Sequence, residues 1–88
     1  MLYRVEARVS LKPGVLDAPG QVLQRSLHNL GFDEVKEVRV GKHITMEVEA
    51  DSPEQARARV AQMGEQLLAN PVVELFDFEI FEGAEAAR

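Results

Sequence analysis

The chain has 88 residues, of which 45% are hydrophobic and 28% charged, and a formal net charge of -5. This length fits one domain, and so small a domain leaves much of its surface unburied, so support from a partner is expected. The absence of cysteine excludes disulfide scaffolds, thiol nucleophiles and thiolate metal sites. The first residues alternate polar and apolar side chains, unlike a signal peptide or a membrane span, which predicts a cytoplasmic protein without membrane association.

Charge is unevenly distributed along the chain. Residues 1–45 hold seven bases and five acids, a balance of +2, whereas residues 46–88 hold three bases and ten acids, a balance of -7. Phosphate backbones repel such an acidic surface, so nucleic acid is not an expected partner. The charge balance favours another protein as the partner.

The first part of the chain predicts a strand followed by a helix. Apolar and polar residues alternate over 3–11, the period of a half-buried strand, and Lys12-Pro13-Gly14 then predicts a turn. Asp17 is expected to cap the helix that follows, and Gly31 suits its left-handed end. An apolar stripe is expected to bury this helix against a sheet; it consists of Val22, Leu23, Leu27 and Leu30.

The second part predicts a hairpin, a helix and a last strand. Residues 35–40 predict a second strand, and Gly41-Lys42 predicts a tight turn into a third strand over 43–50. Ser52-Pro53-Glu54-Gln55 matches a capping box, which starts a second helix, and Asn70-Pro71 ends it. The expected inward residues are Ile44, Met46, Val48 and Ala50 on the third strand, Ala56, Val60, Met63 and Leu67 on the helix, and Phe76, Phe78 and Ile80 on the last strand.

This order predicts an α+β fold, the ferredoxin-like plait. Two βαβ halves meet at Gly41 in the order βαββαβ, and right-handed crossovers place both helices on one face of a four-stranded antiparallel sheet. The expected strand order is fourth, first, third, second. Residues 1–82 are expected to form this single domain, and residues 83–88 a frayed tail.

The other face of the predicted sheet has no helix to cover it. Leu75 and Phe81 lie on that face, although the remaining positions there are mostly charged. Exposed apolar side chains and unpaired strand edges favour association. We therefore expect a homodimer or homotetramer in which Leu75 and Phe81 are contacts.

No catalytic or metal site can be assembled from the residues. His28 and His43 lack a third ligand at metal-site spacing, and no glycine-rich phosphate loop is present. A helix cap is favoured over a catalytic carboxylate for Asp17, and no nucleophile, base and orienting group form a set. Two interpretations remain open for three basic residues: they are ordinary solvated surface charges, or they contact an anion or an acidic partner. These residues are Lys12, Arg39 and Lys42.

Several blocks of the chain resemble one known family. Leu11-Lys12-Pro13-Gly14-Val15-Leu16-Asp17, with Gly20 after it, is similar to the segment that follows the first strand in the PurS family, the small subunits of phosphoribosylformylglycinamidine synthase. The blocks over 30–32, 38–42 and 67–74 follow in the right order. Together they cover nearly the whole chain.

The resemblance implies a non-catalytic subunit of an enzyme of purine biosynthesis. In such a complex a glutaminase subunit releases ammonia, and a large synthetase subunit uses ATP, magnesium and that ammonia to convert formylglycinamide ribonucleotide to formylglycinamidine ribonucleotide. The small subunit is implied to join these two partners, to assist ammonia transfer and to bind no cofactor itself. The expected partner contacts are the family-like residues that core packing does not explain: Lys12, Pro13, Gly14, Asp17, Arg39, Gly41, Lys42 and His43.

Three other functions share the predicted fold. An ACT-like module that senses amino acids at a dimer interface is the main alternative, and the Pro13-Gly14 turn is a weak match to its glycine-rich turn. An acylphosphatase-like hydrolase needs a cradle for phosphate, which is not found in the sequence. RNA binding needs exposed aromatic residues on the central strands, where residues 43–49 place His43, Thr45, Glu47 and Glu49.

Overall fold

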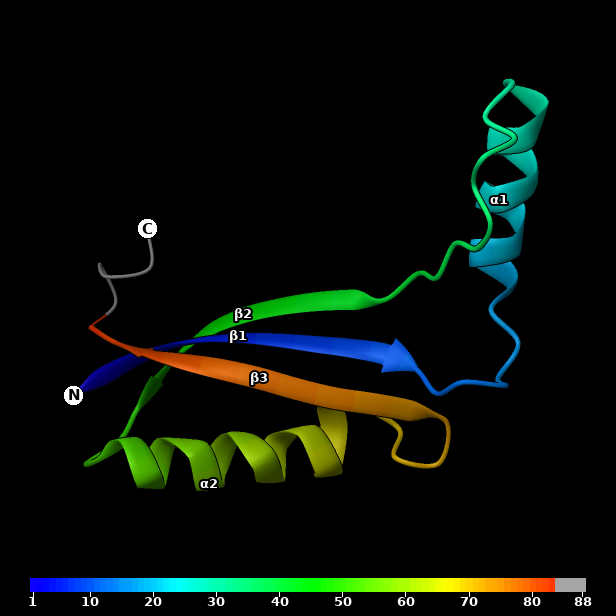
Figure 1. Cartoon of the computed structure of the whole chain (residues 1–88). Coiled ribbons are helices and arrows are strands. Elements are labelled where there is room, and N and C mark those ends of the chain that lie inside the picture. Colours follow the sequence, from blue (N-terminus) through cyan, green and yellow to red (C-terminus); the bar gives the residue numbers. More distant parts are fainter. Residues whose placement is uncertain (84–88) are drawn as a thin grey trace.

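The computed structural model describes residues 1–83 and shows an α+β fold (Figure 1). Of the predicted tail over 83–88, residues 84–88 lie outside the described residues. Three strands form an antiparallel sheet in the order β2-β1-β3, which confirms the predicted pairing of the first strand with the third and the last. The elements in chain order are β1 (Leu2–Leu11), α1 (Ala18–Asn29), β2 (Lys42–Glu49), α2 (Pro53–Met63), the π-helix η1 (Gly64–Leu68) and β3 (Glu74–Glu82).

The core lies between the sheet and α2. The alternation of β1 turns every second side chain towards α2, where Tyr3, Val5, Ala7 and Val9 are buried. From α2, Ala56 and Val60 are completely buried against this layer. The predicted inward faces of the third and last strands are also confirmed, because Val48 is buried and Met46, Phe76, Phe78 and Ile80 pack around the core.

The start of α2 has the predicted capping motif, but the residues at its end do not face the core as predicted. Ser52 Oγ accepts a hydrogen bond from Gln55 N at 3.1 Å, and the Gln55 side chain reaches back to Asp51 N. The prediction that Leu67 is buried is wrong, since its side chain is 82% exposed. The wider π turn of η1 changes the angular position of each residue after Met63, so the helical spacing no longer brings Leu67 to the core.

The prediction of a second strand and a hairpin over 35–42 is also wrong. No strand lies between Asn29 and Lys42, so the sheet formed by residues 1–83 has three strands rather than four. The backbone of this segment is bonded to α1 and its cap instead: Val35 O to His28 Nε2 at 2.7 Å and Lys36 O to Gln24 Nε2 at 3.1 Å. These side chains of α1 replace a neighbouring strand as the hydrogen-bond partners.

The two helices do not share one face of the sheet, which corrects the predicted plait. In Figure 1, α2 lies under the sheet, while α1 rises from the far end of β1 on the other side and does not pack on the strands. The chain is therefore extended, with dimensions of 51 × 30 × 14 Å and a radius of gyration of 16.5 Å. A compact chain of this length has a radius of gyration of about 12 Å. We call residues 18–41, which include α1 and the segment returning beside it, the arm.

Candidate functional site

The two segments predicted to contact partners meet at the base of the arm. Residues 12–17 lead from β1 into α1, and residues 38–43 lead from the arm into β2 (Figure 1). They are far apart in the sequence, but hydrogen bonds join them directly. The structure therefore brings most of the predicted contact residues together.

Asp17 is the centre of this junction. Its side chain is 5% exposed, and its carboxylate accepts hydrogen bonds from Gly20 N at 2.9 Å and from Val40 N at 2.7 Å. The first bond caps α1, as predicted, and the second attaches the returning segment. The Val40 N–H, and after it the Gly20 N–H, lower the pKa of the Asp17 carboxyl, because both stabilise its charged form. These bonds give Asp17 a structural role rather than a catalytic one.

Arg39 fixes the other side of the junction. Its guanidinium donates to three backbone carbonyl oxygens at the end of β1 and in the loop that follows: Leu11 and Val15 at 3.4 Å and Lys12 at 3.2 Å. An arginine fork can hold several acceptors at once in this way. Arg39 thus shapes the loop 12–17 as well as carrying a charge at the surface.

The loop after β1 is also bound to the turn before β3. Lys12 donates from its backbone N to Val73 O at 2.9 Å and from Nζ to Pro71 O at 2.7 Å. Pro13 and Gly14 are exposed at the tip, where Gly14 has a φ of +86° that a residue with a Cβ rarely adopts. The tip is thus presented on a rigid base.

Gly41, Lys42 and His43 lie where the arm joins β2. A Cβ at Gly41 would come within 2.6 Å of Val9 O, so the glycine permits the close approach of the returning segment to β1. Lys42 and His43 are exposed. His43 Nε2 lies 3.9 Å from Glu6 Oε1 on the face of the sheet that no helix covers, away from the junction.

The predicted oligomer contacts lie on that same uncovered face of the sheet. Leu75 is opposite Ser10 and is about half exposed, and Phe81 is opposite Arg4 and is partly buried. Most of their neighbours there are charged: Arg8 Nε bonds Asp77 at 2.9 Å, and Arg4 pairs with Glu6 at 3.3 Å. That Leu75 and Phe81 are contacts stays a prediction.

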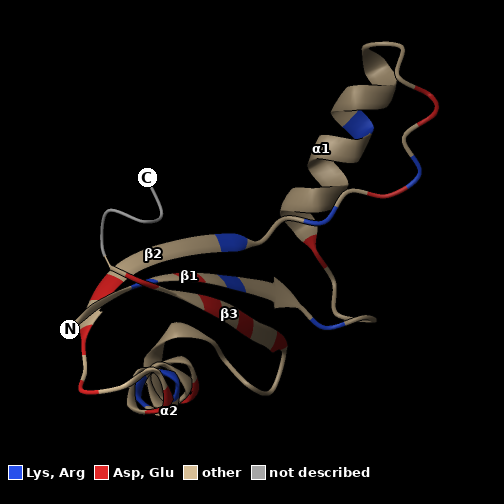
Figure 2. Cartoon of the chain, turned by 60° about the vertical axis from the view of Figure 1, so that its left-hand side comes forward, with Lys and Arg blue, Asp and Glu red and all other residues tan. Residues whose placement is uncertain are grey.

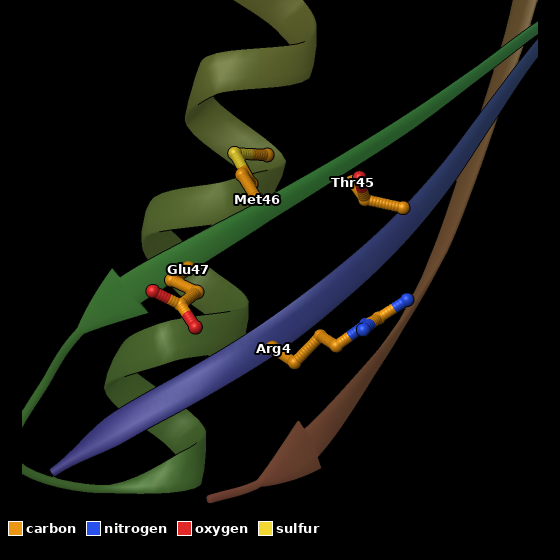
Figure 3. A pocket seen from close by; sticks show the side chains of 4 residues that line it. All are labelled: Arg4, Thr45, Met46 and Glu47. Carbon is orange, nitrogen blue, oxygen red and sulfur yellow. The ribbon is translucent and has the colours of Figure 1, made fainter. Parts of the chain in front are cut away.

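Several hollows lie beside these features, two of them at the base of the arm and at β2. One of about 380 Å³ lies at the base of the arm, between residues 14–17, α1 and residues 37–39. The other, of about 240 Å³, lies at β2 and is lined by Arg4, Thr45, Met46 and Glu47 (Figure 3). Within residues 1–83, no cluster of three acidic or histidine side chains is arranged to hold a metal ion. No helix in the described part of the chain is long and apolar enough to cross a membrane.

Sequence reasoning missed the exposed apolar surface of the arm. The stripe expected to be buried is in large part exposed, with exposed fractions of 56% for Val22, 48% for Leu23 and 74% for Leu30. Its helical spacing is the same whether a helix packs on its own sheet or on another molecule, so no signal in the sequence distinguishes the two.

Comparison with known proteins identifies the family. The sequence pattern of PurS, phosphoribosylformylglycinamidine (FGAM) synthase, matches residues 4–82. The chain belongs to the PurS family. A PurS subunit of FGAM synthase from Synechocystis sp. is 43% identical over 84 residues, which cover 93% of this chain and 84% of the relative.

Solved PurS structures have the same fold. Bacillus subtilis PurS superimposes with a TM-score of 0.83 at 40% identity, covering 91% of this chain and 99% of the other. A chain in the structure of PurLQS from Thermotoga maritima gives a TM-score of 0.84 at 34% identity, covering 92% and 99%. The family supports the resemblance drawn from the sequence, and no finding supports the ACT-like alternative. The chain is a PurS-type subunit of FGAM synthase.

Proposed function

We propose that the chain bridges the glutaminase and the ATP-dependent synthetase subunits of its complex and assists ammonia transfer between them. The observation that carries this proposal is the similarity over nearly the full chain to a PurS chain from a PurLQS structure. Ammonia released into water at neutral pH is mostly protonated and no longer a nucleophile, so a water-excluding contact between two active sites protects it. The reaction served is the conversion of formylglycinamide ribonucleotide to formylglycinamidine ribonucleotide.

The division of labour follows from the residues available. The sequence has no cysteine, so this chain cannot supply the thiol nucleophile of a glutaminase. We assign glutamine to the glutaminase partner, and ATP and magnesium to the synthetase partner, with no cofactor held by this chain. The cytoplasmic location remains a prediction.

The base of the arm is the proposed contact with these partners. Pro13 and Gly14, at the tip of its loop, and Lys42 are exposed. The hydrogen bonds of Asp17 and Arg39 fix the backbone that carries these residues. A preorganised surface loses less conformational entropy on binding than a flexible one. We also propose a homo-oligomer, because residues 1–83 leave apolar side chains of the arm exposed and both outer edges of the sheet unpaired among themselves.

Reconstituting the enzyme with and without this chain tests the bridging role. With the cognate glutaminase and synthetase subunits, omission of the chain is expected to remove most glutamine-dependent turnover, since released ammonia is then lost to water. Turnover supplied with excess ammonia is expected to change little, because it needs no transfer. Product formation is followed in both reactions; an equal response of both, or of neither, contradicts the proposal.

Replacement of Arg39 tests the proposed contact surface. Arg39→Ala, alone or combined with Lys42→Ala, is expected to weaken binding to the partner subunits by about tenfold, because the loop 12–17 loses its bonded frame. Pull-down of both partners measures the effect. Arg57→Ala, at an exposed position of α2, is the matched control. Unchanged recovery of both partners with the Arg39 variant would exclude this surface.

A further inference from the structure

A third hollow, at the end of α2, is mostly apolar. It has a volume of about 300 Å³ and lies between α2, η1 and the turn that leads into β3. Its apolar lining consists of Ala61, Ala69, Pro71, Leu75 and Phe76. In Figure 1 this turn, in yellow and orange, lies at the end of the sheet where the loop after β1 also leaves it. The hollow is therefore next to the proposed contact surface at the base of the arm.

The walls of this hollow are held in place. The Phe76 ring lies directly against Gly64, where a Cβ would collide with it. The turn is closed by its own bonds, since Asn70 O accepts from Glu74 N at 2.7 Å and Glu74 Oε1 accepts from Asn70 N at 2.6 Å. Lys12 ties the turn to the loop after β1. A preformed apolar hollow loses little entropy when an apolar side chain enters it.

The segments that form the hollow also expose apolar side chains to solvent. Leu67 of η1 and Val72 of the turn are 82% and 77% exposed, and Leu75 at the start of β3 is about half exposed. Apolar side chains exposed beside an apolar hollow mark an interaction site rather than ordinary surface. The hollow and its surroundings therefore suit an apolar side chain of another protein.

The charge around the hollow favours a basic partner. Glu65 and Glu74 line it together with Lys12, and Glu65 forms no ion pair within residues 1–83. The strand that continues from the turn, β3, carries four acids and no base, as the red bands on β3 in Figure 2 show. A second copy of this chain has a net charge of -5 and is repelled by such a surface. A Lys or Arg side chain is attracted to it.

Of the two proposed partners, the synthetase suits this charge better. It binds ATP and a ribonucleotide, whose phosphate groups require Lys and Arg side chains, whereas glutamine has no phosphate. We propose that the hollow between α2, η1 and the turn before β3 binds an apolar side chain of the synthetase subunit, and that a neighbouring Lys or Arg of the synthetase pairs with Glu65. The inference rests on the proposed function and adds to it one site and the partner that occupies it.

A polar side chain in the hollow tests the apolar contact. Ala61 lines the hollow from the exposed side of α2, so Ala61→Gln changes the hollow without opening the core. This variant is expected to weaken binding to the synthetase at least tenfold. Ala58→Gln, at an exposed position of the same helix outside the hollow, is the matched control and is expected to bind as the wild type does. Titration of the purified synthetase, with the glutaminase present and absent, measures the binding.

A charge reversal tests the ion pair with the synthetase. Glu65→Lys is expected to weaken binding about tenfold at low salt, and the difference from the wild type is expected to shrink at high salt, where charges are screened. Glu34→Lys changes the net charge by the same amount at an exposed position of the arm, and it is expected to have little effect. Equal effects of the two reversals would assign the loss to net charge and exclude a pair at Glu65.

The outcomes separate this inference from the proposed function. Unchanged synthetase binding by Ala61→Gln, or weaker binding of the glutaminase alone, overturns the inference, while glutamine-dependent turnover with the wild-type chain keeps the proposed function. A wild-type chain that does not bind the synthetase overturns both. A chain whose synthetase binding is lost in Ala61→Gln, but whose wild-type form gives no glutamine-dependent turnover, overturns the proposed function alone.

Discussion

Asp17→Ala is expected to lower the melting temperature by roughly 5–10 °C and to loosen the arm. The substitution removes the acceptor for Gly20 N and Val40 N together, so the cap of α1 and the attachment of the returning segment are lost in one step. Thermal unfolding followed by circular dichroism measures the stability, and pull-down of the partner subunits measures assembly. The amount of partner subunit recovered by pull-down is expected to fall by a larger fraction than the helix content measured by circular dichroism.

Ser52→Ala is the matched control for Asp17→Ala. Ser52 caps α2 through one bond to Gln55 N, so its loss is expected to cost about 1 kcal/mol and to leave assembly unchanged. If both variants impair assembly equally, the junction at Asp17 has no special role in positioning the arm.

The pH dependence of stability reports on the same carboxylate. Its folded-state pKa is lower than the ordinary value of 3.8, so its contribution is complete above that value and is lost as pH falls through the folded-state pKa. We expect the wild type to be more stable than Asp17→Asn at pH 7 and to lose this advantage below about pH 4. Urea midpoints at pH 7, 5 and 3 measure the difference; an advantage that does not change with pH contradicts the assignment.

Gly64→Val is expected to destabilise the fold by about 2–3 kcal/mol, a loss of roughly 10–20 °C in melting temperature. Gly64 is buried where α2 passes into η1, and a Cβ there would collide with the ring of Phe76 on β3. The helix must move away from the sheet or the ring must leave its position, and both open the core. Ala61→Val, on the exposed side of α2, is expected to cost about 0.5 kcal/mol or less.

A double substitution tests whether the Phe76 ring is the cause. Gly64→Ala is expected to be clearly destabilising in the natural chain and much less so when combined with Phe76→Leu, which removes most of the ring atoms in the way. Chemical unfolding of the four proteins gives the coupling free energy. A coupling near zero would mean that Gly64 is required for another reason.

Both helices and three of the four predicted strands were predictable because their positions depend on local chemistry. The alternation over β1, the Asp17 and Ser52 caps and the inward residues of β3 all follow from spacing between neighbouring residues, and the structure confirms them. The resemblance to the family could likewise be found without a structure, because it depends only on the identity and order of residues along the chain. The sequence also predicts which individual residues contact the partners, and the structure shows which of these residues lie close together.

Two predictions were wrong because contacts between distant residues decide the structure there: the strand over 35–40 and the burial of the apolar stripe of α1. Residues 35–40 have a pattern that also suits a strand, but Asp17 and the side chains of α1 bind their backbone, so the segment stays with the arm. The stripe of α1 satisfies the spacing of a core helix, and yet Leu30 is 74% exposed.

The sequence by itself determined the class of fold, the family and the positions of the caps, because these depend on neighbouring residues and on residue identity. The tertiary structure alone decided that the arm leaves the sheet, that Arg39 and Asp17 join two distant segments, and that both sheet edges stay open within the described residues. The physical reason is that a hydrophobic stripe or an alternating segment specifies only that it needs a partner; which partner it finds is settled by hydrogen bonds and close contacts between residues far apart in the chain.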